Sequence, residues 1–134
     1  MKCYICRMKQ TVYTSNAPAP IGPYSQAQRA GDFLFVSGQI AIDPATQEFI
    51  SSSAGEEAKM VMSNIEAILQ EASCSWSDVC KTSIFLMDMS DFPSVNEVYS
   101  KYFVGNFPAR ETVQVAGLPK NARVEISAVV YLGK

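Results

Sequence analysis

The sequence predicts one α+β domain, in which two helices cover one face of a mixed sheet of about six strands. Two stretches carry apolar residues at helical spacing, and short runs rich in β-branched and aromatic residues precede, separate and follow them. The length of 134 residues corresponds to a single domain. We assign residues 1–8 to an N-terminal extension and residues 9–134 to the domain.

The first predicted elements are a short strand over residues 9–13 and a rigid loop over residues 17–23. Three prolines stiffen this loop, because each fixes its own φ angle and pushes the preceding residue into an extended form. The loop therefore holds Tyr24, which follows it, in a defined place.

Two further strands are predicted over residues 24–30 and 33–39, joined by a hairpin turn at Gly31-Asp32. Strict alternation along the second of them places Gly38 on one face of the sheet, with Leu34 and Val36. The same alternation places Ser37 and Gln39 on the other face.

A long helix begins after Ser53, which has capping-box spacing to Glu56. Its apolar positions follow one helical face, and Glu57 and Asn64 are counted with its polar face. The stripe consists of Ala58, Val61, Met62, Ile65, Ile68, Leu69 and Ala72. A second helix is capped by Asp91 and ends before Gly105.

The remaining strands are predicted over residues 79–87, 110–115 and 123–132. The connection between the last two contains a glycine and a proline, which are typical of turns. If these two strands pair as a hairpin, Arg110 and Glu125 reach the same pocket. A guanidinium fixes a carboxylate in a two-pronged hydrogen bond, and a nearby carboxylate can hold or deprotonate a water molecule.

Two helices cannot cover both faces of such a sheet, and the uncovered face carries apolar side chains. They are Phe33, Phe35, Phe85, Met87, Val129 and Tyr131. An exposed apolar patch of this extent marks an interface, so we expect an oligomer built through the sheet face. Alternation along the last two strands puts Arg110 and Glu125 on that face, in a polar pocket between subunits.

Composition excludes several kinds of function. The chain has no histidine, which removes histidine-based acid–base catalysis, Ser-His and Cys-His pairs and histidine metal sites. The net charge of −2 and the lack of a basic stripe argue against a nucleic-acid partner. Cys3 and Cys6 form a CxxC pair without the further ligands of a zinc site, so we expect free thiols. No apolar run is long enough to cross a membrane, and we expect a cytoplasmic protein without metal or cofactor.

Four segments together resemble the Rid family of reactive intermediate (enamine/imine) deaminases, over nearly the whole chain from about residue 8. They are Ala19-Pro20-Ile21-Gly22-Pro23-Tyr24-Ser25-Gln26-Ala27, Phe35-Val36-Ser37-Gly38-Gln39-Ile40, Phe92 with Val95-Asn96-Glu97-Val98-Tyr99, and residues 108–120 with Val124-Glu125-Ile126. The resemblance implies a chorismate-mutase-like fold and a homotrimer, with the sheets lining a barrel and a cleft at each subunit boundary. It also implies hydrolysis of 2-imino and enamine acids, such as 2-aminoacrylate or 2-iminobutanoate, to 2-keto acids and ammonia.

The resemblance implies roles for individual residues as well. Arg110 matches the arginine that binds the substrate carboxylate, and Glu125 matches the glutamate that positions the attacking water. Tyr24 matches a tyrosine lining the cleft, and Gly38 and Thr112 match positions that offer backbone groups. Position 112 is often cysteine in relatives, so a thiol role is excluded here.

Two other residues near these positions receive predictions. Ser37, which shares the strand of Gly38, is placed with the substrate-binding residues, although its face of the sheet alone does not decide a role. Asn96 is given a structural role near the site, with its amide satisfying backbone groups of a loop.

Three other functions are weighed against the deaminase. A pericyclic catalyst acting on chorismate would need several converging cations, whereas the chain has four arginines, of which only Arg110 is well placed. A non-catalytic binder of small carboxylates or a chaperone-like module is the alternative from another class of function. Ribonuclease activity or inhibition of translation fits poorly with the missing histidine and the acidic balance.

Overall fold

A computed structural model describes residues 9–133 of the chain, so the predicted extension over residues 1–8 lies outside the described part, as do Cys3 and Cys6. Its strands and α-helices are β1 (Gln10–Val12), β2 (Ala27–Ala30), β3 (Phe33–Gln39), α1 (Ala54–Glu71), β4 (Val79–Leu86), α2 (Phe92–Ser100), β5 (Ala109–Gln114) and β6 (Val124–Tyr131). Three short 3-10 turns, Trp76–Asp78, Met89–Asp91 and Pro119–Asn121, complete the set.

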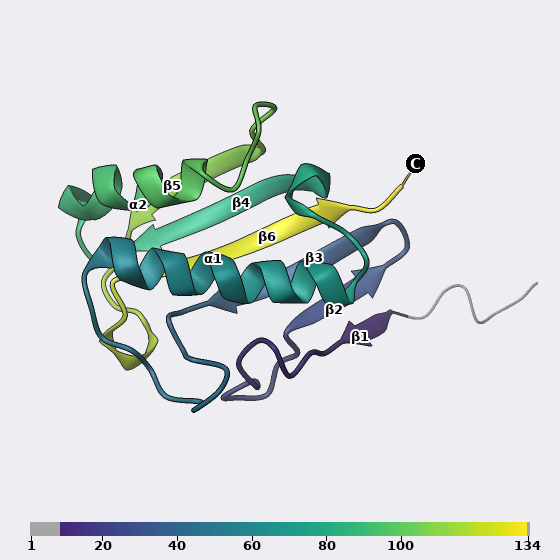
Figure 1. Cartoon of the computed structure of the whole chain (residues 1–134), viewed down its shortest axis with the longest axis horizontal. Coiled ribbons are helices and arrows are strands. Elements are labelled where there is room, and N and C mark those ends of the chain that lie inside the picture. Colours follow the sequence, from purple (N-terminus) through teal and green to yellow (C-terminus); the bar gives the residue numbers. More distant parts are fainter. Residues whose placement is uncertain (1–8, 134) are drawn as a thin grey trace, which may run out of the picture.

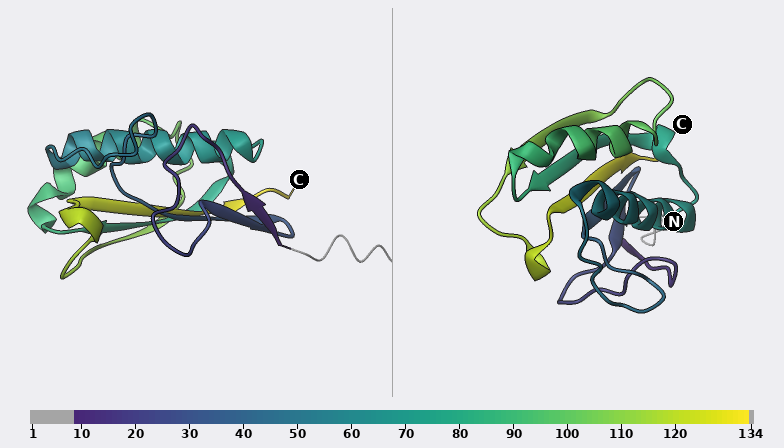
Figure 2. Two further views of the ribbon diagram at one scale, coloured as in Figure 1. Left: turned by 90° about the horizontal axis from the view of Figure 1, so that it is seen from below. Right: turned by 60° about the vertical axis from the view of Figure 1, so that its left-hand side comes forward.

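The six strands form one mixed sheet in the order β1-β2-β3-β6-β4-β5, and both helices lie on the same face of it (Figures 1 and 2). Strands β4 and β5 are parallel, and the other neighbours are antiparallel. The predicted α+β class, the mixed six-stranded sheet and its one-sided helical cover are therefore confirmed.

The predicted hairpin between the last two strands is wrong, because β4 lies between β5 and β6. The apolar pattern explains this order. In the β4–β6 ladder Ile84 faces Ile126, and both side chains are fully buried. The β5 segment alternates between exposed and half-buried residues and takes the edge of the sheet. Strand β4, which is more apolar than β5, thus lies inside the sheet and pairs with a neighbour on each side, β6 and β5.

Helix α1 packs its predicted stripe against the sheet, where all its members except Ala72 are fully buried. Ser53 caps the helix by accepting a 3.3 Å hydrogen bond from the Glu56 backbone N–H, as expected from the spacing. Two residues counted with its polar face, Glu57 and Asn64, are buried instead. Asn64 donates a 2.8 Å hydrogen bond from Nδ2 to the carbonyl oxygen of Ile42.

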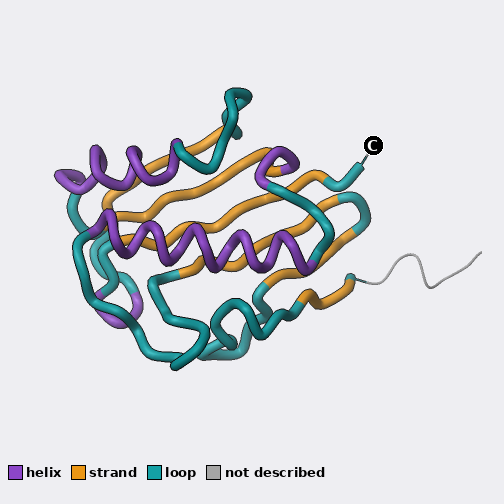
Figure 3. The backbone as a smooth tube through the Cα atoms, viewed as in Figure 1, coloured by secondary structure: helices purple, strands orange, loops and turns teal. Residues whose placement is uncertain are grey.

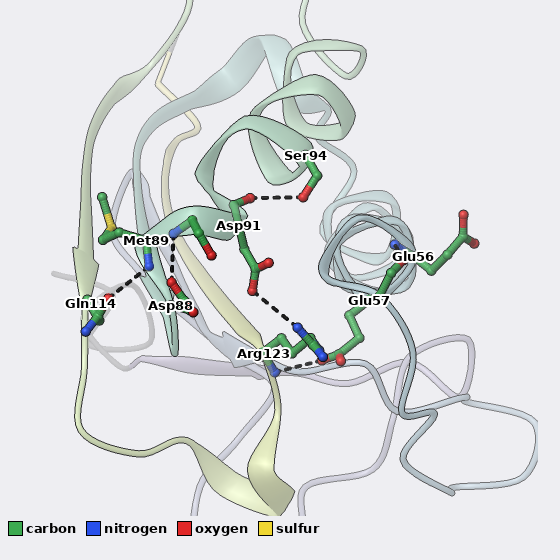
Figure 4. A network of polar contacts seen from close by, with 10 residues as sticks. Glu56, Glu57, Asp88, Met89, Asp91, Ser94, Gln114 and Arg123 are labelled. Atoms are coloured by element: carbon green, nitrogen blue, oxygen red, sulfur yellow. Dashed lines mark hydrogen bonds and ion pairs between the residues drawn. The ribbon is translucent and has the colours of Figure 1, made fainter.

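Glu57 belongs to a polar network that joins the starts of α1, α2 and β6 (Figure 4). Its Oε1 accepts the backbone N–H of Arg123 at 2.9 Å, and the Arg123 guanidinium lies 3.6 Å from Oδ2 of Asp91. Burial raises the pKa of the Glu57 carboxyl. This network sets the position of α2 relative to the beginning of β6.

The predicted strand over residues 24–30 begins only at Ala27, because the preceding segment is held by a side chain. Gln26 is buried and bonds the backbone of Thr14, Ala17 and Pro18, which closes the loop after β1. The connections from β1 to β2 and from β3 to α1 lie beside each other (Figure 3), joined by a 2.9 Å bond from the Ala19 N–H to Oε1 of Gln47.

Candidate functional site

Arg110 lies near the start of β5 with its guanidinium against helix α2. Nη1 donates a 2.7 Å hydrogen bond to Oδ1 of Asn96. The central guanidinium carbon lies 4.9 Å from the ring centre of Tyr99 and 5.6 Å from that of Phe92, both within reach of a cation–π interaction. None of the ion pairs found within residues 9–133 includes Arg110. The cation is therefore held by neutral groups.

The Arg110 guanidinium borders a groove of about 680 Å³ between α2 and the start of β5. The groove is lined by Pro93, Asn96, Glu97, Tyr99, Ser100, Phe107, Pro108 and Arg110. It is open to solvent and mixes polar with aromatic walls. The groove is large enough for a small organic anion to reach the Arg110 guanidinium.

The prediction that Arg110 and Glu125 share the uncovered face of the sheet is wrong. Arg110 pairs with Thr82 in the β4–β5 ladder, and the Thr82 side chain is fully buried beneath α2. Glu125 alternates with Val124 and Ile126, which are fully buried on that same helix-covered side. Within one chain, Arg110 therefore lies on the helix-covered face and Glu125 on the opposite face.

Glu125 lies beside a β-bulge in β3. The β3–β6 register shifts by one residue between Val36 and Gln39, so that Gln39 pairs with the buried Ile126. The predicted alternation beyond Val36 is thus wrong, and Gly38 is brought next to the Glu125 side chain. A Cβ atom on Gly38 would collide with the Glu125 carboxylate and lie 2.8 Å from its Cδ. Glycine is required here for close approach.

The Glu125 carboxylate has no hydrogen-bond or ion-pair partner among the side chains and backbone groups of residues 9–133. It is half-buried, and burial alone raises the pKa of its carboxyl above the ordinary value. A carboxylate with a raised pKa is a stronger base than an exposed one, which is typical of acid–base sites.

Ser37 and Tyr24 belong to the same side of the molecule as the bulge. The Ser37 hydroxyl donates a 2.6 Å hydrogen bond to the carbonyl oxygen of Ser25, the residue that follows Tyr24. Tyr24 is exposed, and its hydroxyl oxygen accepts the backbone N–H of Ile21 at 3.2 Å. The predicted residues Tyr24, Ser37, Gly38 and Glu125 thus come from one region around β3 and β6.

The other predicted residues, Asn96 and Thr112, accompany Arg110. Thr112 pairs with the buried Ile84, two residues along β5 on the helix-covered side. Its hydroxyl oxygen is buried and has no hydrogen-bond partner in the described chain. Asn96 bonds the Arg110 side chain, so the predicted role of satisfying loop backbone groups is replaced by a direct contact with the guanidinium.

Three residues of the Arg110 environment had no assigned role from the sequence. Phe92 and Tyr99 form the rings over the guanidinium, and Thr82 shares a 2.7 Å hydrogen bond with the Tyr99 hydroxyl. Positions 92, 96 and 99 are spaced by four and three residues, which puts them on one side of a helix. This spacing could have indicated a cluster around Arg110, but it is equally typical of a helix side that packs into the core.

Other kinds of site find no support in residues 9–133. No group of three or more cysteine, aspartate and glutamate side chains is arranged to hold a metal ion within that range. Its two cysteines, Cys74 and Cys80, are both free, and burial raises the pKa of the Cys74 thiol to about 11. No described helix is both long and apolar enough to span a bilayer.

Residues 14–132 match the family model described as Endoribonuclease L-PSP. A RutC family protein of Pyrococcus horikoshii is 49% identical over 124 residues, which cover 92% of this chain and 98% of the relative. A human protein named 2-iminobutanoate/2-iminopropanoate deaminase is 44% identical over 126 residues, covering 94% of this chain and 92% of the relative.

The chain is also similar to solved structures. RidA from the Antarctic bacterium Psychrobacter superposes with a TM-score of 0.88 at 43% identity, covering 91% of this chain and 98% of RidA. TdcF of E. coli, solved with bound serine, gives a TM-score of 0.88 at 36% identity, covering 92% of this chain and 99% of TdcF.

Proposed function

The chain belongs to the endoribonuclease L-PSP family, which includes RidA, and from that premise we propose that it hydrolyses small 2-imino and enamine acids to 2-keto acids and ammonia. The observation that carries the proposal is that Arg110 and Glu125 both lack an oppositely charged partner among residues 9–133. The deaminase name of the human relative at 44% identity supports the same reaction.

Arg110 is the proposed carboxylate-binding residue. Its guanidinium borders an open groove, has a neutral hydrogen-bond partner and carries a charge that no described side chain neutralises. A planar guanidinium matches a carboxylate with two parallel hydrogen bonds. TdcF, whose solved structure holds serine, is a relative with a carboxylate-bearing ligand.

Glu125 is the proposed base that holds the attacking water. In the reaction, water adds to the imino carbon and passes a proton to the Glu125 carboxylate. The carboxyl then returns this proton to the nitrogen of the resulting carbinolamine. The C–N bond breaks with its electron pair leaving on ammonia, and the hydroxyl proton passes to the Glu125 carboxylate as the keto group forms. Because an imine is already electrophilic, orienting the substrate and the water supplies most of the acceleration. The guanidinium stabilises negative charge beside the carbon under attack.

A cleft that contains both residues needs two copies of the chain, because Arg110 and Glu125 lie on opposite faces of one sheet. We propose that Asn96, Arg110 and Thr112 of one subunit meet Tyr24, Ser37, Gly38 and Glu125 of the next, in a homotrimer. Apolar side chains on the uncovered sheet face supply a surface for such an assembly.

The test is a coupled assay. An amino-acid lyase generates 2-iminobutanoate, and appearance of the 2-keto acid is followed with and without this protein. The proposal predicts faster keto-acid formation, proportional to the protein added. Binding of 2-oxobutanoate without any acceleration would identify a non-catalytic carboxylate binder instead.

A further inference from the structure

We propose that Asn96 is a positioning residue whose lack of charge is essential, an inference that rests on the proposed function of Arg110. Its amide oxygen fixes the guanidinium in place without neutralising it. The full positive charge then remains available to a ligand carboxylate.

The geometry around the guanidinium supports a fixed position. Asn96 accepts from Nη1 at 2.7 Å, and the ring of Tyr99 lies under the guanidinium at 4.9 Å. The Tyr99 hydroxyl is anchored by a 2.7 Å hydrogen bond to Thr82, and both residues are buried. Thr82 of β4 is the ladder partner of Arg110 in β5, so this pair of strands positions both the Tyr99 ring and the guanidinium.

The bonding pattern leaves Arg110 largely free. A guanidinium has five N–H donors, and the bond to Asn96 is the one hydrogen bond from this side chain within residues 9–133. The acidic residue of the groove, Glu97, is directed to Lys101, whose Nζ lies 4.0 Å from its Oε1. The hydrogen-bonding capacity and the charge both point to an anion that the chain itself does not provide.

Aspartate at position 96 would have nearly the same shape as asparagine but would place a carboxylate against the guanidinium. A charged pair at hydrogen-bond distance is stronger than a bond to a neutral amide. If Asn96 served only the fold, aspartate would be tolerated or would stabilise the protein. If its neutrality serves ligand binding, aspartate would occupy the cation and exclude the substrate.

The experiment compares Asn96→Asp with Asn96→Ala, and uses Gln70→Glu as the matched control. Gln70 is exposed near the end of α1 and does not line the groove, so that variant makes the same change from amide to carboxylate away from Arg110. Binding of 2-oxobutanoate is measured by calorimetry, KM and kcat by the coupled assay, and folding by thermal melting.

We expect affinity to fall in the order wild type, Asn96→Ala, Asn96→Asp, with the aspartate variant weaker than wild type by at least about tenfold and melting no lower. Gln70→Glu should change affinity by less than about threefold. An aspartate variant that binds better than the alanine variant would overturn the inference, as would equal losses in Asn96→Asp and Gln70→Glu. A wild-type protein that neither binds the keto acid nor hydrolyses the imine would refute the proposed function itself.

Discussion

Arg110 and Glu125 are half-buried charged side chains, and neither has an oppositely charged partner within the described range 9–133. Arg110 is half-buried between a neutral amide and two aromatic rings. Glu125 is half-buried beside Gly38. Sheltered charges without partners reduce stability, and such sites are commonly functional.

Arg110→Lys should reduce turnover at least about tenfold, equivalent to roughly 1.4 kcal/mol in the transition state. Lysine keeps the charge but loses the planar fork that matches a carboxylate, and it also loses stacking on the rings. The coupled keto-acid assay gives kcat/KM, and sedimentation shows whether assembly is intact. An unchanged kcat/KM would indicate that Arg110 serves only the structure.

Glu125→Gln should increase stability at neutral pH while it lowers turnover. Burial raises the folded-state pKa of this carboxyl above its ordinary value near 4.5, so the folded state binds its proton more readily than the unfolded state. Stability from this group is therefore greatest below the ordinary pKa and falls as pH rises through the window up to the raised pKa. Glutamine does not ionise and avoids that loss.

Thermal melts of both proteins across pH 4 to 8 measure this effect. The melting temperature of Glu125→Gln should exceed that of the wild type at the neutral end, and the difference should vanish at the acidic end. A variant less stable than wild type at neutral pH would reveal a favourable partner for the carboxylate in the assembly.

The sequence marked these two residues as candidates for the site, but it did not give the faces of the sheet on which they lie. Alternation gives the relative orientation of residues within one strand, whereas the face also depends on which strand is the neighbour. The assumed hairpin assigned Arg110 to the wrong face, since β4 separates β5 from β6. The sequence predicted that Asn96 lies near the site. Its hydrogen bond to Arg110 joins α2 to β5, and no local sequence pattern encodes a contact between two such elements.

At the scale of the element, the bulge in β3 determines where the Glu125 carboxylate lies. The one-residue shift between Val36 and Gln39 puts Gly38 where a side chain would meet Glu125. Sequence alternation predicted a regular strand, because a bulge leaves no clear mark beyond the presence of a glycine. The buried Glu57 and Asn64 were missed for a related reason: their partners are backbone groups of distant segments.

Gly38→Ala should lower turnover with little loss of stability. The added methyl group meets the carboxylate end of a side chain, which can rotate away, so the strand itself is not forced to move. Turnover should fall at least about tenfold because the base leaves its position. The coupled assay and a thermal melt on the same sample measure both effects, and Gly117→Ala is the control because nothing lies within 4 Å of a Cβ at Gly117.

At the scale of the whole molecule, the sheet has a face that no helix covers (Figure 2). Phe33, Phe35 and Tyr131 are each more than two-fifths exposed there, and the rings of Phe33 and Tyr131 lie 5.5 Å apart. The sequence predicted this apolar face correctly, because the number of helices and the alternation of the strands sufficed.

Phe35→Lys should disrupt the proposed homotrimer, because it places a charge on the exposed apolar face through which the subunits are proposed to associate. Light scattering at micromolar concentration should give a trimer mass for the wild type and a smaller mass for the variant. Val104→Lys, at a fully exposed loop position, is the control and should remain trimeric. A monomeric wild-type protein would refute the shared cleft.

The most direct test of the shared cleft is to mix two inactive variants, Arg110→Met and Glu125→Gln, by co-expression. If each cleft takes Arg110 from one subunit and Glu125 from its neighbour, random trimers made from equal amounts should recover about a quarter of wild-type activity. Each homotrimer alone should remain inactive. If both residues acted from the same chain, no cleft in the mixture would contain an intact pair, and the absence of recovered activity in verified mixed trimers would contradict this account.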